Sequence, residues 1–333
     1  MKSFRTHEEL VAILADRGLA IGDPTRALRE LRRHGYHRLG GYRYPFRELL
    51  PAGEQNAASR SYRDDKYVPG ASFEDVLSLA EFDAKLRRVC LEGLLEFEVR
   101  LRSALAHRLA AIHPMAHVTK GCLDEAVCDE RTASEYTKLE SWLNTVRESQ
   151  RRAVQADDDY VSHHFVEHPS TDVPVWALVE LVDFGSLPFL MDLMRASDLN
   201  SVAREFGTNN GKTLVTWTRA QVDLRNVAAH SLRLFNRRMK RRIVVRSGSG
   251  AGPQLDHLVE HPKNLTDRAY SVLAVLAYVL KSHESGTNWH LTLRTQIRKF
   301  PNCAGPVPSE YQLSPSASMG FPSEWDTLDL WCE

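Results

Sequence analysis

The sequence is poor in cysteine, and its cysteines are not spaced as disulfide or zinc-binding residues usually are. There are five, an odd number, and no two of them form a C-x-x-C pair: Cys90, Cys122, Cys128, Cys303 and Cys332. Small secreted proteins use even numbers of cysteines for disulfides, and structural zinc sites use closely spaced pairs. We therefore expect reduced thiols, which are typical of a cytoplasmic protein.

Long hydrophobic runs are also absent. A membrane-spanning helix needs about 18 consecutive apolar residues, and the nearest candidate, residues 173–191, contains Glu180 and Asp183. The first ten residues, MKSFRTHEEL, carry charges where a secretory signal would be apolar. We expect no membrane partner, no export and a cytoplasmic location. The chain has 333 residues, 43 % of them hydrophobic, which is enough for a sizeable core.

An excess of charge of one sign is missing too. The 43 Lys+Arg balance the 43 Asp+Glu, and this neutrality argues at first sight against a polyanionic partner. The charges are segregated along the chain, however. Residues 225–246 contain eight basic residues and no acidic one, and residues 26–47 contain seven basic residues and one glutamate. The segment after Lys299 contains five acidic residues and no basic one, so the neutrality is a sum of two basic blocks and an acidic tail.

Apolar residues recur at helical spacing through most of the chain, whereas period-two alternation is scarce. Asp23-Pro24 predicts a capped helix start, and S-F-E-D at Ser72 matches a capping box before a long apolar stripe. The sequence thus predicts a mainly α, multi-helix fold, with helices at residues 6–16, 24–34, from 72 onward, and at 130–155, 176–195, 198–206, 212–243, 266–282 and 291–299. We expect three segments: a basic and aromatic helical N-terminal segment (1–68), a helical domain (69–299) and an irregular, Pro-rich acidic tail (300–333) that packs on the core.

The segment LRNVAAHSLRLFNRR (residues 224–238) has one polar and one apolar face when it is placed on a helix of 3.6 residues per turn. The polar sector contains no carboxylate and consists of Arg225, Asn226, His230, Arg233, Asn236 and Arg237. Imidazole exchanges protons near neutral pH, and guanidinium groups bind phosphate oxygens and stabilise added negative charge. Metal-independent RNA cleavage requires these groups, because the ribose 2′-hydroxyl must attack the adjacent phosphate. Since no acidic cage accompanies them, we expect neither a metal ion nor another cofactor.

The spacing Arg-x4-His alone is a weak signal, because four pairs in the chain have it: Arg32/His37, Arg102/His107, Arg108/His113 and Arg225/His230. Only the last pair lies within a wholly polar sector. The alternative interpretation of residues 224–238 is a basic surface helix without catalysis. For Arg102 the alternative is an ordinary helix salt bridge, because Glu98 precedes it by four residues.

The segment RNVAAHSLRLFNR also resembles a family signature, R-N-x-x-A-H-x-x-R-L-x-N-R, of the Abi family of phage abortive-infection proteins (AbiD and AbiF type), which belongs to the HEPN superfamily of α-helical ribonucleases. Further blocks that resemble the family follow in the same order, at residues 15–46, 70–107, 173–187 and 319–331. The resemblance implies a HEPN-like helical bundle and a toxin-like endoribonuclease of antiviral defence. It makes Arg225 and His230 the catalytic pair and Asn226 the polar residue beside the arginine. Family members often have a second histidine directly after the first, where this chain has Ser231.

The resemblance also implies a composite active site in which two such motifs face each other. A homodimer would bring together two Arg225/His230 pairs, and Arg102/His107 is the candidate for a second motif within one chain. RNA is the expected partner, and a small non-coding RNA is a further partner by analogy. We expect the RNA backbone to contact Arg233, Asn236, Arg237, Arg238, Lys240, Arg241 and Arg242, and also Arg38, Tyr42 and Arg43. The competing functional class is a non-catalytic RNA-binding or complex-forming protein that keeps the HEPN scaffold.

Two further features each have two interpretations. The stretch RRHGYHRLGGYRYPFR (residues 32–47) interleaves arginine with aromatic residues, which suits phosphate contact with base stacking or a packing seam beside the helical core. His164 and His168 have the i, i+4 spacing of a two-ligand metal face, with His163 beside them. Solvent-facing histidines near a turn are the simpler interpretation of that stretch.

Overall fold

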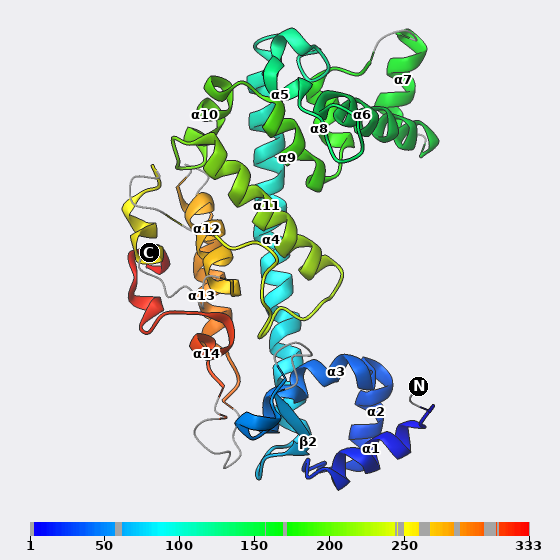
Figure 1. Ribbon diagram of the computed structural model, residues 1–333, viewed down its shortest axis with the longest axis vertical. Helices are drawn as coiled ribbons and strands as arrows, with labels where there is room; N and C mark the ends of the chain where they lie inside the picture. Colours follow the sequence, from blue (N-terminus) through cyan, green and yellow to red (C-terminus); the bar gives the residue numbers. More distant parts are fainter. Residues whose placement is uncertain are drawn as a thin grey trace. The chain divides into compact units, whose positions relative to one another are not determined.

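The protein is mainly helical, as the sequence predicts: 66 % of the residues that the structure describes are in helices and 4 % in strands (Figure 1). The structure is a computed structural model that describes residues 3–56, 62–156, 158–168, 172–243, 245, 250–259, 267–282, 287–302, 311 and 313–332. The chain forms two compact units, each assembled from three stretches. Unit 1 consists of Met1–Val89, Val227–Arg237 and Thr292–Trp325, and unit 2 of Cys90–Asn226, Arg238–Leu291 and Asp326–Glu333.

Unit 1 begins with short helices whose ends are set by local signals. The elements are α1 (His7–Asp16), α2 (Pro24–His34), α3 (Tyr36–Arg43), β1 (Arg47–Leu49), β2 (Arg63–Tyr67) and α14 (Pro315–Met319), with the first part of α4 (Phe73–Ala110). Thr6 and Glu9 form a capping box at α1, and the Asp23 carboxylate accepts from Thr25 N at 2.9 Å at the start of α2. Both helix starts therefore lie where the sequence predicts them.

A short β-hairpin in unit 1 was not expected from the sequence. Strands β1 and β2 pair antiparallel, with Arg47 opposite Tyr67 and Leu49 opposite Arg63. Their residues are mostly charged and show no alternation of apolar and polar side chains, which is why the pattern does not indicate strands.

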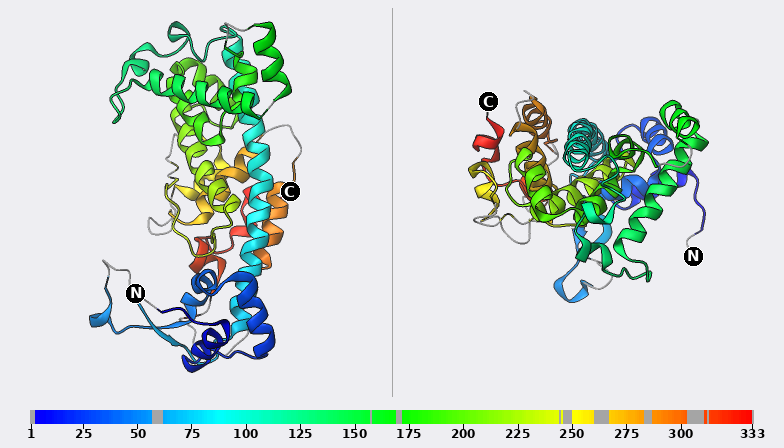
Figure 2. Two further views of the ribbon diagram at one scale, coloured as in Figure 1. Left: turned by 90° about the vertical axis from the view of Figure 1, so that its right-hand side faces the viewer. Right: turned by 90° about the horizontal axis from the view of Figure 1, so that it is seen from above.

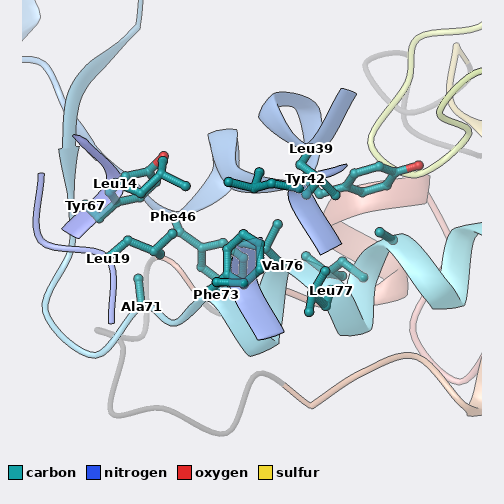
Figure 3. Close-up of a cluster of buried hydrophobic side chains, with 14 of the residues drawn as sticks. Leu14, Leu19, Leu39, Tyr42, Phe46, Tyr67, Ala71, Phe73, Val76 and Leu77 are labelled. Carbon is teal, nitrogen blue, oxygen red and sulfur yellow. The ribbon is translucent and has the colours of Figure 1, made fainter. Parts of the chain in front are cut away.

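The core of unit 1 is a cluster of buried side chains from α1 to α4 (Figure 3). Phe46, Phe73 and Val76 lie in the middle of the drawn cluster. Tyr42 lies at one end, with its hydroxyl pointing away from the other labelled side chains. Phe235, which is distant in sequence, completes the cluster and has its ring 6.3 Å from that of Tyr42. The segment after α11 is therefore part of this core.

Unit 2 packs helices around the second part of α4, and α8 to α10 are the green helices beside it in Figures 1 and 2. Phe97 on α4 contacts Phe184 and Phe206 with ring centroids 6.1 and 5.7 Å apart. The elements are α5 (Glu125–Asp129), α6 (Lys138–Gln155), α7 (Asp159–Glu167), α8 (Val175–Leu181), α9 (Leu187–Leu193), α10 (Ala196–Glu205), α11 (Gly211–Ala229), α12 (Ala269–Lys281) and α13 (Trp289–Arg298), of which α11 and α13 each extend into unit 1.

Several predicted helix bounds are wrong. The predicted helix 130–155 begins only at Lys138, where Thr137 and Glu140 form a capping box. The predicted helix 176–195 is divided into α8 and α9 by a 3-10 turn, Phe184–Ser186. The largest difference concerns the predicted helix 212–243, because α11 ends at Ala229. The cause of that early end is described below.

In the part of the chain that the structure describes, every helix is too short or too polar to span the hydrocarbon core of a bilayer. Among the described residues, Cys90, Cys122, Cys128 and Cys332 form no disulfide bond. The remaining residues named from the sequence lie outside the described ones: Arg246, Thr266, Cys303, Glu310 and Glu333.

Candidate functional site

Helix α11 ends in a Schellman motif, and His230 is its C-cap residue. Ser231 N donates to Ala228 O at 3.1 Å and Leu232 N donates to Val227 O at 2.9 Å, which satisfies two carbonyls of the last turn. Ser231 has a φ of 54°, the left-handed conformation that follows the end of a helix in this motif. The prediction that residues 230–238 continue the helix is therefore wrong, and with it the common polar sector from Arg225 to Arg237. His230 is exposed at the end of the helix.

Beyond the end of α11, the buried carboxylate of Asp83 on α4 accepts hydrogen bonds that backbone carbonyls would accept in a continued helix. Residues 230–237, here called the motif loop, belong to unit 1. Leu234 N donates to the Asp83 carboxylate at 3.1 Å, and Phe235 N donates to it at 2.6 Å. A continued helix would give these two N–H groups to the carbonyls of residues 230 and 231. The motif loop thus bends around Asp83 and places the Phe235 ring in the core.

Two arginines predicted to bind RNA hold the motif loop against α3. Arg38 donates to Ser231 O at 2.7 Å, and Arg233 donates to Gly41 O at 2.7 Å. A Cβ at Gly41 would lie 3.0 Å from Arg233 Nε, so the glycine permits the close approach. The Arg233 side chain is half-buried, whereas the Arg38 side chain is exposed.

Tyr42 and Arg43 lie inside unit 1, each with 2 % of its surface exposed. The Tyr42 hydroxyl donates to the Asp83 carboxylate at 2.6 Å, and its burial raises the pKa of Tyr42 far above the usual value. The Arg43 guanidinium lies 4.0 Å from the centroid of the Tyr36 ring and donates to Tyr36 O. The packing interpretation of the aromatic stretch therefore describes both residues, and neither is placed to contact RNA.

Arg225 and Asn226 lie in the last two turns of α11, in the part that belongs to unit 2. The Arg225 guanidinium lies 5.8 Å from the centroid of the Phe184 ring, within the range of a cation–π interaction. Its Nε is buried, and among the described residues this atom has no hydrogen-bond partner and Arg225 has no paired carboxylate. The residue as a whole is half-buried, and its positive charge is not neutralised by a described side chain.

Three of the remaining basic residues predicted to bind RNA lie near carboxylates, which partly neutralise their charge. Within unit 2, Arg241 pairs with Asp223 at 2.6 Å, and Arg238 and Arg242 lie 3.7 and 3.8 Å from Asp267. The Arg238 and Arg242 side chains are exposed and accessible to a phosphate, whereas the Asp267 side chain is buried and lowers the net positive charge of this group. Lys240 and Arg238 are exposed. Asn236 and Arg237, in unit 1, are half-buried, and Asn236 has a left-handed φ of 50°.

The candidate second motif is not assembled in unit 2. Arg102 is buried, forms an ion pair with Glu98, and donates to Val179 O and Val182 O at the end of α8. The salt-bridge alternative predicted for Arg102 is thus confirmed. His107 is exposed, whereas the Arg102 guanidinium is already engaged by Glu98 and by the end of α8.

The predicted two-histidine face consists of His164 in α7 and His168, the C-cap residue of that helix, and their ring planes are tilted by 55°. His164 and His168 have ring centroids 5.3 Å apart, and Tyr160 stacks on His164 at 6.1 Å. Across the described residues, no group of three or more His, Cys, Asp and Glu side chains is placed to hold a metal ion.

Sequence reasoning missed Asp83, the residue that shapes this site. A signal for it exists, because Asp83 interrupts the apolar stripe of α4 between Phe82 and Leu86, and Arg87 follows four residues later. A carboxylate on a buried helix face must be paired and hydrogen-bonded. That rule predicts a polar partner for this position, although it does not identify the Leu234 and Phe235 N–H groups.

The fold and the site define a mainly helical protein with an Arg-Asn-x3-His motif at the end of a helix. The family model described as Abi-like protein matches residues 29–236, which include the Arg225–His230 motif, Asp83 and α3. The match covers more than half of the chain, and the chain therefore belongs to the Abi-like family. Comparisons with curated proteins and with solved structures gave no significant match.

Proposed function

We propose that this protein is a metal-independent endoribonuclease of the HEPN type that acts as a toxin in abortive-infection phage defence. The observation that carries the proposal is the Arg-Asn-x3-His motif of an Abi-like family member, with its histidine exposed directly after α11 and no carboxylate paired with its arginine among the described residues. An exposed imidazole can transfer protons and a guanidinium can bind phosphate oxygens, and cleavage of a phosphodiester uses both.

In the proposed reaction the imidazole of His230 withdraws the proton of a ribose 2′-hydroxyl. The 2′-oxygen attacks the adjacent phosphorus, the bond from phosphorus to the 5′-oxygen breaks, and an imidazolium returns a proton to that oxygen. The products are a 2′,3′-cyclic phosphate and a 5′-hydroxyl end. Arg225 stabilises the charge that builds on the phosphate oxygens, and Asn226 orients the two.

Two motifs that face each other supply the base and the acid of this reaction separately. In a homodimer the His230 of one copy acts as the base and that of the other as the acid, since one imidazole cannot be in both protonation states at once. We favour this arrangement over a second motif within the chain, because Arg102 is already bonded to Glu98 and to the end of α8.

The test is cleavage of RNA by the purified protein in EDTA. We expect 5′-hydroxyl ends from the wild type, and loss of cleavage with retained RNA binding for His230→Ala. The matched control is His107→Ala, because His107 is also exposed and also lies five residues after an arginine. Equal cleavage by wild type and His230→Ala would remove the enzymatic proposal and leave the RNA-binding class. Loss of cleavage in His107→Ala would place the second motif within the chain.

A further inference from the structure

The Asp83 carboxylate is fully buried and its hydrogen-bonding capacity is used completely. It accepts from the Tyr42 hydroxyl, the Arg87 guanidinium, and the N–H groups of Leu234 and Phe235. A carboxylate has about four acceptor positions, and four donors from α3, α4 and the motif loop fill them. A buried charge with all of its bonds made fixes the geometry of the groups around it.

Two of these donors decide where α11 ends. The sequence from His230 to Arg242 contains neither glycine nor proline, so nothing in it stops a helix. In a continued helix the N–H groups of Leu234 and Phe235 would bond to the carbonyls of His230 and Ser231. Asp83 takes both N–H groups, and the chain instead closes the Schellman motif at Leu232. A contact more than 140 residues away in the sequence thus competes with the local helical preference.

We propose that Asp83 is the positioning residue that ends α11 at Ala229 and thereby presents His230 as an exposed C-cap residue. The expected effect of Asp83 on RNA cleavage rests on the proposed function, whereas its effect on the helix end does not. Removal of the carboxylate frees two N–H groups, which then favour extension of α11 through the motif loop. The extension moves the His230 side chain from the helix end to a place within the helix, and a misplaced general base costs rate rather than binding.

The test compares Asp83→Leu, whose side chain has no acceptor for the two N–H groups, with the wild type in two independent measurements. The first is the backbone 13Cα chemical shift of residues 230–237 by NMR, which we expect to become helical in the variant. The second is RNA cleavage, for which we expect kcat to fall roughly tenfold or more while KM stays within about twofold. The matched control is Asp198→Leu, because Asp198 is also a buried carboxylate paired with an arginine, Arg108, but in unit 2. We expect that control to leave kcat and the 230–237 shifts unchanged.

A rescue variant separates positioning from general stability. Ser231→Gly favours the left-handed conformation that ends the helix, and we expect it to recover part of the lost kcat in the Asp83→Leu protein. If Asp83→Leu does not fold because Arg87 is left unpaired, Asp83→Leu/Arg87→Leu removes both charges of the buried pair and is measured instead.

Unchanged shifts in a folded Asp83 variant would overturn the claim that Asp83 ends the helix. Helical shifts with an unchanged kcat would overturn its positioning role. If the wild type does not cleave RNA at all, the proposed function fails, while the NMR measurement still decides the structural claim.

Discussion

Ser231 adopts a backbone conformation that costs energy for any residue with a Cβ. Its φ of 54° lies in the left-handed region, and its N–H and that of Leu232 close the end of α11. Glycine is the usual residue at this position of a Schellman motif, and its absence here hides the helix end from sequence reasoning. The chain thus stores strain directly beside the proposed catalytic histidine.

Ser231→Gly should therefore stabilise the protein. We expect the free energy of unfolding to rise by about 1 kcal/mol, because the left-handed conformation no longer meets a Cβ. Urea unfolding followed by circular dichroism measures this change. Ser231→Ala is the control and should leave stability nearly unchanged, since alanine keeps the Cβ. A stabilising alanine and a neutral glycine would contradict the explanation.

Tyr42 offers a second test at the scale of one atom. Tyr42→Phe removes the hydroxyl that lies 2.6 Å from the Asp83 carboxylate and leaves a buried acceptor without its donor. We expect a loss of about 1–3 kcal/mol of unfolding free energy. RNA affinity should stay at the wild-type value, because the ring is buried. Weaker RNA binding with unchanged stability would instead support the base-stacking interpretation.

At the scale of elements, the helices with local signals could be predicted and those shaped by distant contacts could not. Thr6 and Asp23 are capping residues within their own helices, and α2 begins and ends at the predicted residues. The end of α11 depends on Asp83, a residue of another helix, and the β-hairpin depends on pairing across a loop. The proposed catalytic residues Arg225 and His230 could be predicted as a motif in the sequence. Their backbone conformation could not, because it depends on contacts with distant residues.

The interaction between α3 and the motif loop leads to opposite expectations for two basic residues. Arg38 donates to Ser231 O, whereas exposed Lys240 has no acidic partner among the described residues. We expect Arg38→Ala to lower kcat and to leave the salt dependence of RNA binding unchanged. Lys240→Ala should weaken binding and reduce the slope of log K against log salt by about 0.7. Fluorescence anisotropy at several salt concentrations measures both, and an Arg38→Ala slope that falls equally would contradict the assignment.

At the scale of the whole molecule, the two units explain why charge along the sequence is an incomplete guide. Much of the basic block at residues 26–47 is engaged within unit 1, where Arg26 pairs with Glu74, Arg32 with Glu8 and Arg47 with Asp65. Unit 1 also recruits Val227–Arg237 and Thr292–Trp325, stretches that no local pattern connects to the N-terminus. The sequence shows only that basic residues cluster along the chain. The structure shows which of them are paired with carboxylates.

Acid should destabilise the protein through His117 in unit 2. His117 is fully buried with both ring nitrogens unpartnered, and burial lowers its pKa from 6.5 to about 4. Between these values the unfolded chain binds a proton that the folded chain does not, so stability falls as the pH drops from 6.5 to 4. The loss is on the order of 3 kcal/mol. Urea unfolding at pH 7 and pH 5 should show a smaller pH dependence for His117→Leu than for the wild type, and an equal one would contradict this cause.

The central claim is that the Arg225–His230 motif cleaves RNA, and one measurement tests it most directly. Wild type, His230→Ala and His107→Ala are incubated with the same RNA in EDTA, and the ends of the products are identified. The account predicts 5′-hydroxyl ends from wild type and His107→Ala and none from His230→Ala, with equal RNA binding by all three. Cleavage by His230→Ala at the wild-type rate, or no cleavage by the wild type under conditions in which it binds RNA, would contradict it.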